Sequence, residues 1–258
     1  EQRNELFNPD HVTYVVGQEQ RIHFERLFNA AEKIGFVKDG KPSFTHLYFG
    51  FYVDSETGKK LSSRDTVSGV LNLLKESKEY FLSRISDRSD RGEEECLHAA
   101  QELTVGSLVF NDLKQDLKGS VDIDAQDMQQ TILGFEKSGG AYVVYSACRA
   151  RSILRKYGKD PMPADQIDQI EIDDQEALLL LKLQQIPQRL IEAVEKNNPS
   201  ILIRHLIDIA SVYNSYYMRA PVIVDGVANP VRLVITKAVE VALIKGLAIC
   251  HISCPEEI

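Results

Sequence analysis

The chain has 258 residues, of which 43% are apolar and 26% are charged, and this composition excludes a disordered protein. At roughly 150 residues per domain, the length predicts one large domain or two smaller ones. Lys and Arg number 30 against 38 Asp and Glu, a net charge of −8 that excludes nucleic-acid binding through overall charge. A nucleic-acid partner therefore has to be held by local basic clusters. No apolar run approaches the roughly 18 residues of a membrane span, so we expect no membrane partner.

Cysteine usage indicates a reducing compartment. The chain has four cysteines, too few for a disulfide framework at this length, and we expect a cytoplasmic or organelle-matrix location. Cys250, His251 and Cys254 fit no standard zinc spacing, so we predict no tightly bound metal. The chain opens at Glu1, and because its first 20 residues contain no apolar h-region we expect no signal peptide. We expect it to be processed or to be part of something longer.

The first elements, in chain order, predict a strand, a helix and a strand. Residues 12–17 are a β-branched run, residues 18–35 a helix that ends at glycine, and residues 45–53 a second strand. The helix carries apolar residues on one side, namely Ile22, Leu27, Ala30, Ala31 and Ile34. Such a crossover is almost always right-handed and makes the two strands parallel.

Two parallel strands do not form a stable sheet by themselves. No other run of comparable strand quality is present, so we expect the sheet to be completed by residues outside this sequence or by another chain. A polar loop, residues 54–66, follows the second strand.

The rest of the chain predicts helices almost throughout, joined into an antiparallel bundle. The charged stretch 86–95 predicts a disordered connector, and residues 220–230 a loop. The expected helices are residues 67–83, 94–110, 125–133, 140–157, 175–185, 187–196, 199–217 and 230–250. The helix at 199–217 should bury Leu202, Leu206, Ala210, Tyr213 and Tyr217. The last helix should bury Val234, Ala238, Val241 and Ala242. The fold class is thus α/β followed by all-α.

Two segments of the first part carry residues suited to binding anions and polar ligands. Lys60, Ser62, Ser63 and Arg64 lie in the polar loop, where cations and hydroxyls can clamp a triphosphate and stabilise a leaving pyrophosphate. The alternative is an ordinary solvated basic loop. Gln20 and His23 follow the first strand, where α/β proteins bind ligands. An ordinary polar helix start explains them as well.

Tyrosines and arginines alternate on two of the expected helices. Tyr142 and Arg149 lie on the helix at 140–157, and Asn214 and Tyr217 lie near the end of the helix at 199–217. Aromatic rings stack on unpaired RNA bases, while arginines contact phosphates. The alternative is half-buried tyrosines beside a solvated arginine face, so spacing alone leaves both interpretations open.

Together these segments resemble one family, the class I arginyl-tRNA synthetases, over almost the whole chain. Residues 15–24 are similar to its VVG-x-x-Q-x-x-HF segment, and residues 60–64, KLSSR, resemble its second ATP signature, often KMSKS. Residues 142–156, YVVYSACRARSILRK, are similar to YVQY-x-HARA-x-SILRK. Matches of this kind continue through residues 199–217 to Pro255 near the C-terminus.

The resemblance implies a Rossmann-like partial parallel sheet, a helical connector and an anticodon-binding bundle, at residues 1–68, 69–138 and 139–258. It implies ATP, carried with magnesium, and arginine and tRNA as substrates. In that family Gln20 would contact arginine and His23 would line its pocket, while Lys60, Ser62, Ser63 and Arg64 would close over the phosphates. Tyr142, Arg149, Asn214 and Tyr217 would contact RNA.

Several positions depart from the family pattern. From the resemblance we expect the HIGH signature to lie before the first residue of this sequence. Asp65 stands where a cation is frequent, and residues 137–141 replace a GDTGP-like segment. Ala147 and Cys148 replace the usual His and Ala, and the last residue is Ile258 instead of Met. Two hypotheses follow: a portion of a working arginine–tRNA ligase, inactive alone, or a diverged paralogue that binds tRNA or regulates. A helical scaffold without an RNA role is the third.

Overall fold

The computed structural model describes residues 2–61, 70–86, 92–124, 127–168 and 170–258. Its contacts divide the chain into two compact units. The N-terminal unit comprises Glu1–Ser62 with Gln115–Ile123, and the helical unit comprises Ser63–Lys114 with Asp124–Ile258.

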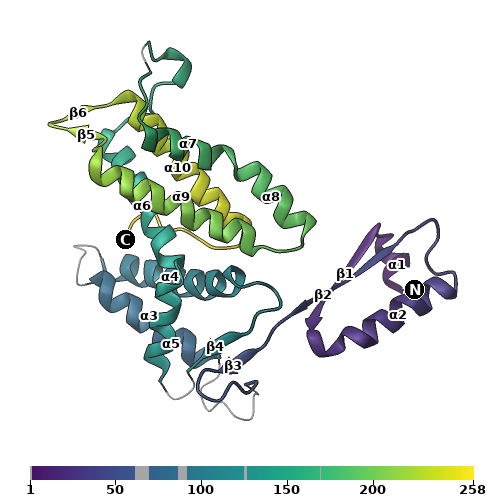
Figure 1. The fold of residues 1–258 in the computed structure, drawn as a ribbon. Helices are drawn as coiled ribbons and strands as arrows, with labels where there is room; N and C mark the ends of the chain where they lie inside the picture. Colours follow the sequence, from purple (N-terminus) through teal and green to yellow (C-terminus); the bar gives the residue numbers. More distant parts are fainter. Residues whose placement is uncertain (1, 62–69, 87–91, 125–126, 169) are drawn as a thin grey trace. The chain divides into compact units, whose positions relative to one another are not determined.

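The N-terminal unit contains the predicted parallel pair. After the short helix α1 (Gln2–Phe7), strand β1 (His11–Gly17) pairs in parallel with β2 (Ser43–Phe49), and Gly17 lies opposite Phe49. The 3₁₀ turn η1 (Gln18–Gln20) and helix α2 (Arg21–Lys33) form the connection between them (Figure 1). The fold-class prediction for this part of the chain is confirmed.

A second parallel pair was not predicted. Strand β3 (Tyr52–Asp54) pairs with β4 (Val121–Ile123), so the single strand expected at residues 45–53 is in fact two. The break is at Gly50, whose N–H donates to the Leu117 carbonyl at 2.8 Å. A Cβ atom at Gly50 would lie 2.0 Å from the Gly119 carbonyl oxygen, so only glycine permits this approach.

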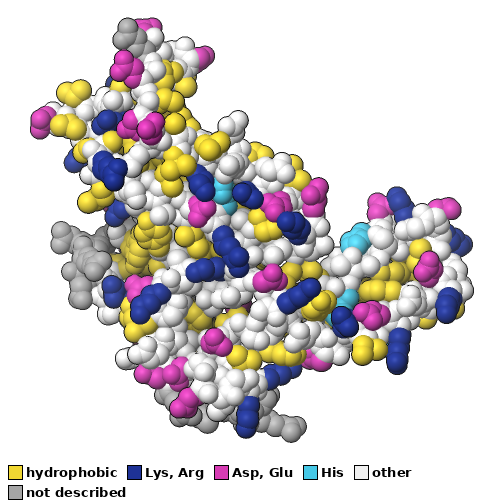
Figure 2. All heavy atoms as spheres, viewed as in Figure 1, with side chains coloured by type: hydrophobic (Ala, Val, Ile, Leu, Met, Phe, Trp, Pro, Cys, Tyr) yellow, Lys and Arg dark blue, Asp and Glu magenta, His cyan; other side chains and the backbone are white. Residues whose placement is uncertain are grey.

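The apolar side of α2 is largely solvent-exposed in this unit. Ile22 is 58% exposed and Ile34 76%, and Figure 2 shows hydrophobic side chains on the surface of the N-terminal unit. The helix instead buries Phe24, whose ring lies 4.8 Å from those of Tyr14 and His46. The reason is that a pair of strands covers only a narrow strip of the helix, and its bulky aromatic residues occupy that strip.

Helices build the other unit almost entirely (Figure 1). They are α3 (Val70–Ser86), α4 (Glu93–Lys114), α5 (Met128–Lys137), α6 (Gly140–Tyr157), α7 (Asp174–Gln184), α8 (Ile186–Glu195), α9 (Ser200–Arg219) and α10 (Pro230–Ile249), with a 3₁₀ turn η2 (Ala164–Gln166). Helix α6 packs against α4, α5, α9 and α10. The loop expected at residues 220–230 contains a hairpin, β5 (Ile223–Val224) and β6 (Val227–Ala228). Its turn is Asp225-Gly226, both with positive φ, the dipeptide that two-residue hairpins favour.

Capping residues fix where several of these helices begin. Asp173 and Glu176 form a reciprocal capping box at α7, and Asn229 accepts from the Arg232 N–H at 3.1 Å to start α10. The Asn198 side chain accepts from the Ser200 N–H at 3.1 Å, although the helix starts one residue later than predicted.

The sets of buried residues predicted for α9 and α10 have different outcomes. Helix α9 buries Leu202, Leu206, Ala210 and Tyr213 as predicted, with Tyr217 half-buried. For α10 the prediction is wrong, because its core side carries Leu233, Val239, Leu243 and Leu247. The predicted residues Val234, Ala238, Val241 and Ala242 line a groove of about 610 Å³ instead. Helix α10 is apolar on most sides, so periodicity could not select the buried one.

Candidate functional site

The polar loop after β3 is a tight, internally bonded turn. Asp54 Oδ1 accepts from the Thr57 N–H at 2.8 Å and from the Thr57 hydroxyl at 2.6 Å. These bonds hold the pKa of Asp54 below its usual value. Gly58, at φ +66°, completes the turn and donates its N–H to the Asp54 carbonyl at 2.8 Å. Lys60 is thereby placed opposite Val53.

The Lys60 ammonium meets the segment that follows β1. It donates to Glu19 Oε1 at 3.3 Å and lies 3.8 Å from the centre of the Phe51 ring. The Glu19 carboxylate folds back over Gly17, where an added Cβ would lie 2.3 Å from Oε2. The backbone N–H of Glu19 itself and then Lys60 lower the pKa of this carboxyl group. The loop cation therefore sits at the carboxyl end of the parallel pair, with an anion as its partner.

The other predicted residues of this unit lie nearby in sequence. Gln20 occupies the N-cap position of α2 without a side-chain capping bond, and is exposed. His23 turns its ring edge-on to Phe24, with centroids 5.3 Å apart. No hydrogen bond or ion pair within residues 2–61 joins either side chain to Lys60. Ser62, Ser63 and Arg64 lie outside the described residues.

The residues predicted for RNA come together between α6 and α9. Arg149 donates to the Asn214 side-chain oxygen, and its guanidinium lies 5.8 Å from the centre of the Tyr217 ring. The Asn214 amide donates to the Ser146 hydroxyl at 2.6 Å, and Ser146 donates to the Tyr142 carbonyl at 2.7 Å. We call these five residues the α6–α9 cluster.

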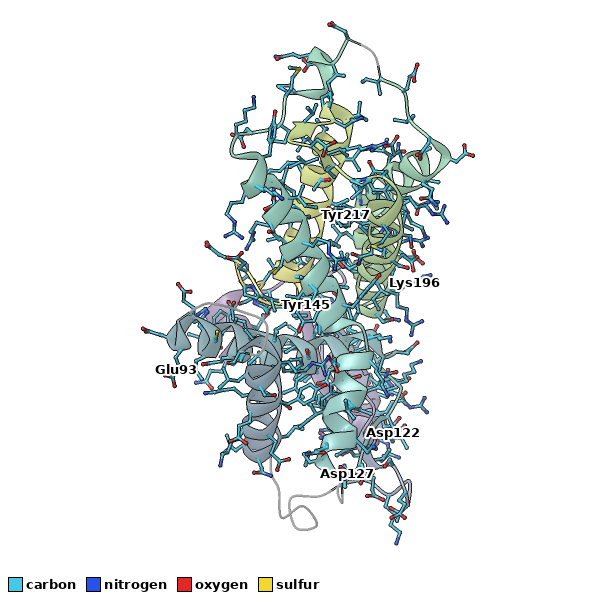
Figure 3. All side chains as sticks on the ribbon, turned by 90° about the vertical axis from the view of Figure 1, so that its left-hand side faces the viewer. Glu93, Asp122, Asp127, Tyr145, Lys196 and Tyr217 are labelled. Carbon is cyan, nitrogen blue, oxygen red and sulfur yellow. The ribbon has the colours of Figure 1, made fainter. Side chains whose placement is uncertain are left out.

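The α6–α9 cluster faces solvent on one side and packs against buried residues on the other. Arg149 is exposed and Tyr142, at the N-terminal end of the same helix face, is 40% exposed. Tyr217, labelled in Figure 3, lies on α9 and contacts the buried Tyr213, with ring centroids 6.4 Å apart. Burial raises the pKa of Tyr213 to about 12, so this ring stays neutral.

The sequence interpretation did not include Ser146. A hydroxyl four residues after Tyr142 and three before Arg149 lies on their helix face, and that spacing was the available signal. The cluster can do two things chemically: its guanidinium can bind a phosphate, and its tyrosine rings can stack on bases. Within the described residues no group of three or more His, Cys, Asp and Glu could hold a metal ion. No described helix combines the length and hydropathy that crossing a membrane requires.

Two family models match the chain in order. Residues 1–119 match the catalytic domain of class I tRNA synthetases for arginine, and residues 143–258 match the DALR anticodon-binding domain. Among curated relatives, an arginine–tRNA ligase from an Exiguobacterium species is 32% identical over 258 residues, covering 99% of this chain and 43% of the relative. One from Pediococcus pentosaceus is 32% identical over 248 residues, covering 95% and 42%.

Comparison with solved structures gives the same family as the sequence comparisons. Thermus thermophilus arginyl-tRNA synthetase superposes with a TM-score of 0.78 at 26% identity, covering 96% of this chain and 41% of that one. The arginyl-tRNA synthetase of Plasmodium falciparum gives 0.74 at 20% identity, with 96% and 41% covered, and supports the fold.

The chain thus joins part of a class I aminoacyl-tRNA synthetase catalytic domain to an anticodon-binding domain. Within that class it comprises a portion of the arginyl-tRNA synthetase catalytic domain followed by a DALR anticodon-binding domain, as the sequence resemblance predicted. It spans about 43% of the length of the curated relatives and is homologous to their C-terminal portion.

Proposed function

We propose that this chain carries the second half of an ATP-dependent arginine–tRNA ligase and cannot form arginyl-adenylate alone. The observation that carries the proposal is the α6–α9 cluster, in which the side chains of Arg149, Asn214 and Tyr217, three of the four residues predicted for RNA, are in contact. Under this proposal residues 1–68 belong to the catalytic domain, 69–138 connect, and 139–258 bind the anticodon. The four reduced thiols fit a cytoplasmic or organelle-matrix location.

In the catalytic part, Lys60 would bind the phosphates of magnesium-bound ATP together with Ser62, Ser63 and Arg64. The ammonium would stabilise the charge that builds on the departing pyrophosphate. Lys60 has to exchange its Glu19 partner for the phosphates, because a carboxylate left beside them would repel them. Gln20 and His23 would line the arginine pocket at the carboxyl end of β1.

An open apolar cavity in the N-terminal unit supports the proposal that additional protein packs against this unit. A cavity of about 550 Å³ opens on this unit and is lined by Tyr14, Leu27, Ala31, Ile34 and other mainly apolar residues. An apolar surface of this kind is normally covered in an α/β layer by more sheet and helix. We propose that a chain or segment with the remaining half of the catalytic domain covers it.

Adenylate formation is tested by arginine-dependent exchange between ATP and pyrophosphate. The 258-residue chain alone should give no exchange, and adding the N-terminal half of a related arginine–tRNA ligase should restore it. In that reconstituted pair, Lys60→Ala should reduce exchange, while the neighbouring Lys59→Ala serves as the matched control. Exchange by the chain alone would contradict the proposal.

tRNA binding is tested by filter binding of arginine tRNA transcripts at two salt concentrations. Tyr217→Ala should weaken binding about 5- to 150-fold, the range for losing one stacked base. Arg149→Ala should weaken it and reduce the salt slope by about one unit. The matched controls are Tyr157→Ala and Arg189→Ala, the latter at a half-buried arginine of α8 that pairs with Glu192. The parent chain should bind arginine tRNA more tightly than transcripts with a changed anticodon. If the Tyr217→Ala variant binds both with equal affinity, the lost contact is with the anticodon.

A diverged tRNA-binding paralogue is the second candidate. It is favoured by Asp65 beside the phosphate loop and by the Glu19 partner of Lys60, since both oppose phosphate binding. If the chain is such a paralogue, the pair reconstituted with the added N-terminal half should give no ATP–pyrophosphate exchange, while the chain still binds tRNA. If neither Tyr217→Ala nor Arg149→Ala changes tRNA affinity, the helical unit is a scaffold and both candidates fail.

A further inference from the structure

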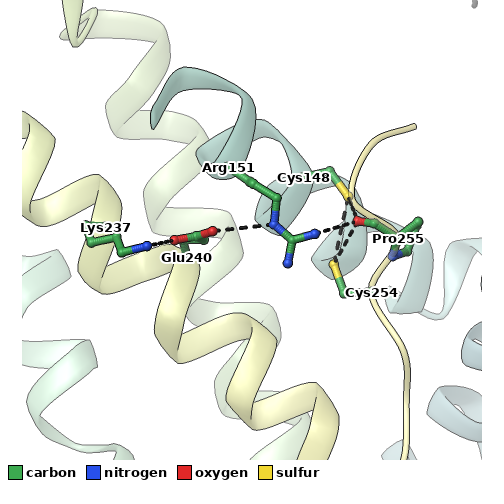
Figure 4. Close-up of polar contacts among 6 residues, drawn as sticks. All are labelled: Cys148, Arg151, Lys237, Glu240, Cys254 and Pro255. Carbon is green, nitrogen blue, oxygen red and sulfur yellow. Dashed lines mark hydrogen bonds and ion pairs between the residues drawn. The ribbon is translucent and has the colours of Figure 1, made fainter. Parts of the chain in front are cut away.

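Two of the four cysteines face each other where the C-terminal segment meets α6. Cys148 lies on α6 and Cys254 lies after the end of α10, with their sulfur atoms 3.8 Å apart (Figure 4). Cys148 donates to the Pro255 carbonyl at 3.1 Å, and Cys254 lies 3.7 Å from the same oxygen. The two thiols therefore occupy one small site beside this carbonyl oxygen.

A cationic network holds this site in place. Arg151 donates to the Pro255 carbonyl at 3.0 Å and to Glu240 at 3.4 Å, and Lys237 donates to the other oxygen of Glu240 at 2.7 Å (Figure 4). The hydrogen bond with Cys148, followed by the charge of Arg151, lowers the pKa of Cys254. The thiolate form of Cys254 is thereby favoured.

Exposure separates the roles of the two thiols. Cys148 is 6% exposed, whereas Cys254 is partly accessible to solvent. Residues 252–258 belong to no helix or strand. A disulfide needs the sulfurs at about 2.05 Å, and rotation of the Cys254 side chain with a small shift of this segment can close the gap. Cys96 and Cys250 are buried, and burial raises the pKa of Cys250.

We propose that Cys148 and Cys254 form a reversible disulfide in response to hydroperoxides, with Cys254 as the attacked thiol and Cys148 as the resolving one. The Cys254 thiolate attacks one peroxide oxygen, the O–O bond breaks and hydroxide leaves, giving a sulfenic acid. The Cys148 sulfur then attacks the Cys254 sulfur and displaces hydroxide, which leaves as water with the Cys148 proton. Both thiols supply the two electrons that reduce the peroxide, and an external dithiol reverses the step.

The bond would fasten the C-terminal segment to the helix that carries the α6–α9 cluster. Cys148 immediately precedes Arg149, and Glu257 already pairs with Arg155 of the same helix at 2.9 Å. Oxidation therefore replaces a set of non-covalent contacts at this helix with a covalent link. The inference stands on the thiol geometry and holds whether or not the chain acts on tRNA.

The test uses the 258-residue chain treated with hydrogen peroxide at near-stoichiometric amounts. The thiol titre under denaturing conditions should fall from four to two, and peptide mapping should find Cys148 linked to Cys254 within one chain. A reducing dithiol should return all four thiols. Cys250→Ala should behave in the same way, with one thiol fewer throughout.

Two variants separate the roles of the thiols. Cys148→Ala should form no disulfide and should retain a sulfenic acid on Cys254 that a dimedone probe captures. Cys254→Ser, a change in a segment without regular structure, should lose both the link and the probe signal. Oxidation spread over Cys96 and Cys250, links between chains, or four thiols surviving the treatment would each overturn the proposal.

Discussion

A buried carboxylate in the helical unit allows a quantitative test of its packing. Glu176, 4% exposed, accepts from the Tyr216 hydroxyl at 2.9 Å, and Tyr216 is 1% exposed. The same carboxylate accepts from the Asp173 N–H at 3.0 Å and pairs with Arg232 at 3.6 Å. Burial and then Glu176 raise the pKa of Tyr216, which stays protonated as the donor.

Replacing Tyr216 by Phe removes this donor with almost no change in volume, so no cavity term arises. A hydrogen bond to a charged group is worth roughly 1.5–3 kcal/mol. Because Arg232 and the Asp173 N–H remain, we expect the lower part of this range, about 1.5–2 kcal/mol of unfolding free energy.

Urea unfolding followed by far-ultraviolet circular dichroism measures the effect. With a slope of about 2 kcal/mol per molar, the midpoint should fall by roughly 0.8–1 M. Tyr157→Phe is the matched control, on a half-buried tyrosine of α6, and should cost less than about 0.5 kcal/mol. A Tyr216→Phe midpoint equal to that of the control would refute the reasoning.

Two further outcomes are expected. Burial lowers the pKa of His205, whose imidazole contacts the Lys182 carbonyl at 2.8 Å, so the unfolded chain takes up a proton first as the pH drops below about 6.5. Stability should therefore fall between pH 7 and pH 5.5, and less so in His205→Gln; equal pH slopes in both proteins would speak against this. A Cβ atom at Gly246 would lie 2.5 Å from Leu206 Cδ2, so Gly246→Ala should cost about 1–3 kcal/mol. A thermal midpoint unchanged from the parent would contradict that estimate.

The spacing of apolar residues, together with the glycines and prolines at element ends, predicted the elements that local interactions determine. Helix α6 was expected at residues 140–157, and the structure has it with those bounds between residues of positive φ at Gly139 and Gly158. The β1–α2–β2 crossover and the buried side of α9 were likewise predictable, because each depends on one strong local pattern. The residues proposed for RNA could be grouped by helix face, although their contact through Ser146 required the structure.

The predictions that were wrong depend on contacts between distant segments. Strand β4 has three residues and pairs with β3 from far along the chain, which is too little for a local pattern to indicate. The buried side of α10 is set by α6, α7 and α9 together, not by its own period. The hairpin at residues 223–228 differs from these cases, because the local dipeptide Asp225-Gly226 is typical of a hairpin turn although only a loop was predicted there.

The pairing of β3 with β4 also affects how this protein is made. The ribosome delivers β3 before α3 and α4, and β4 only after them. The N-terminal unit therefore cannot complete its hydrogen bonding until residue 123 has emerged, by which time two long helices of the other unit are already outside the tunnel. A gene split anywhere between β3 and β4 would leave the earlier product with an unpaired strand edge, whichever helices it retained.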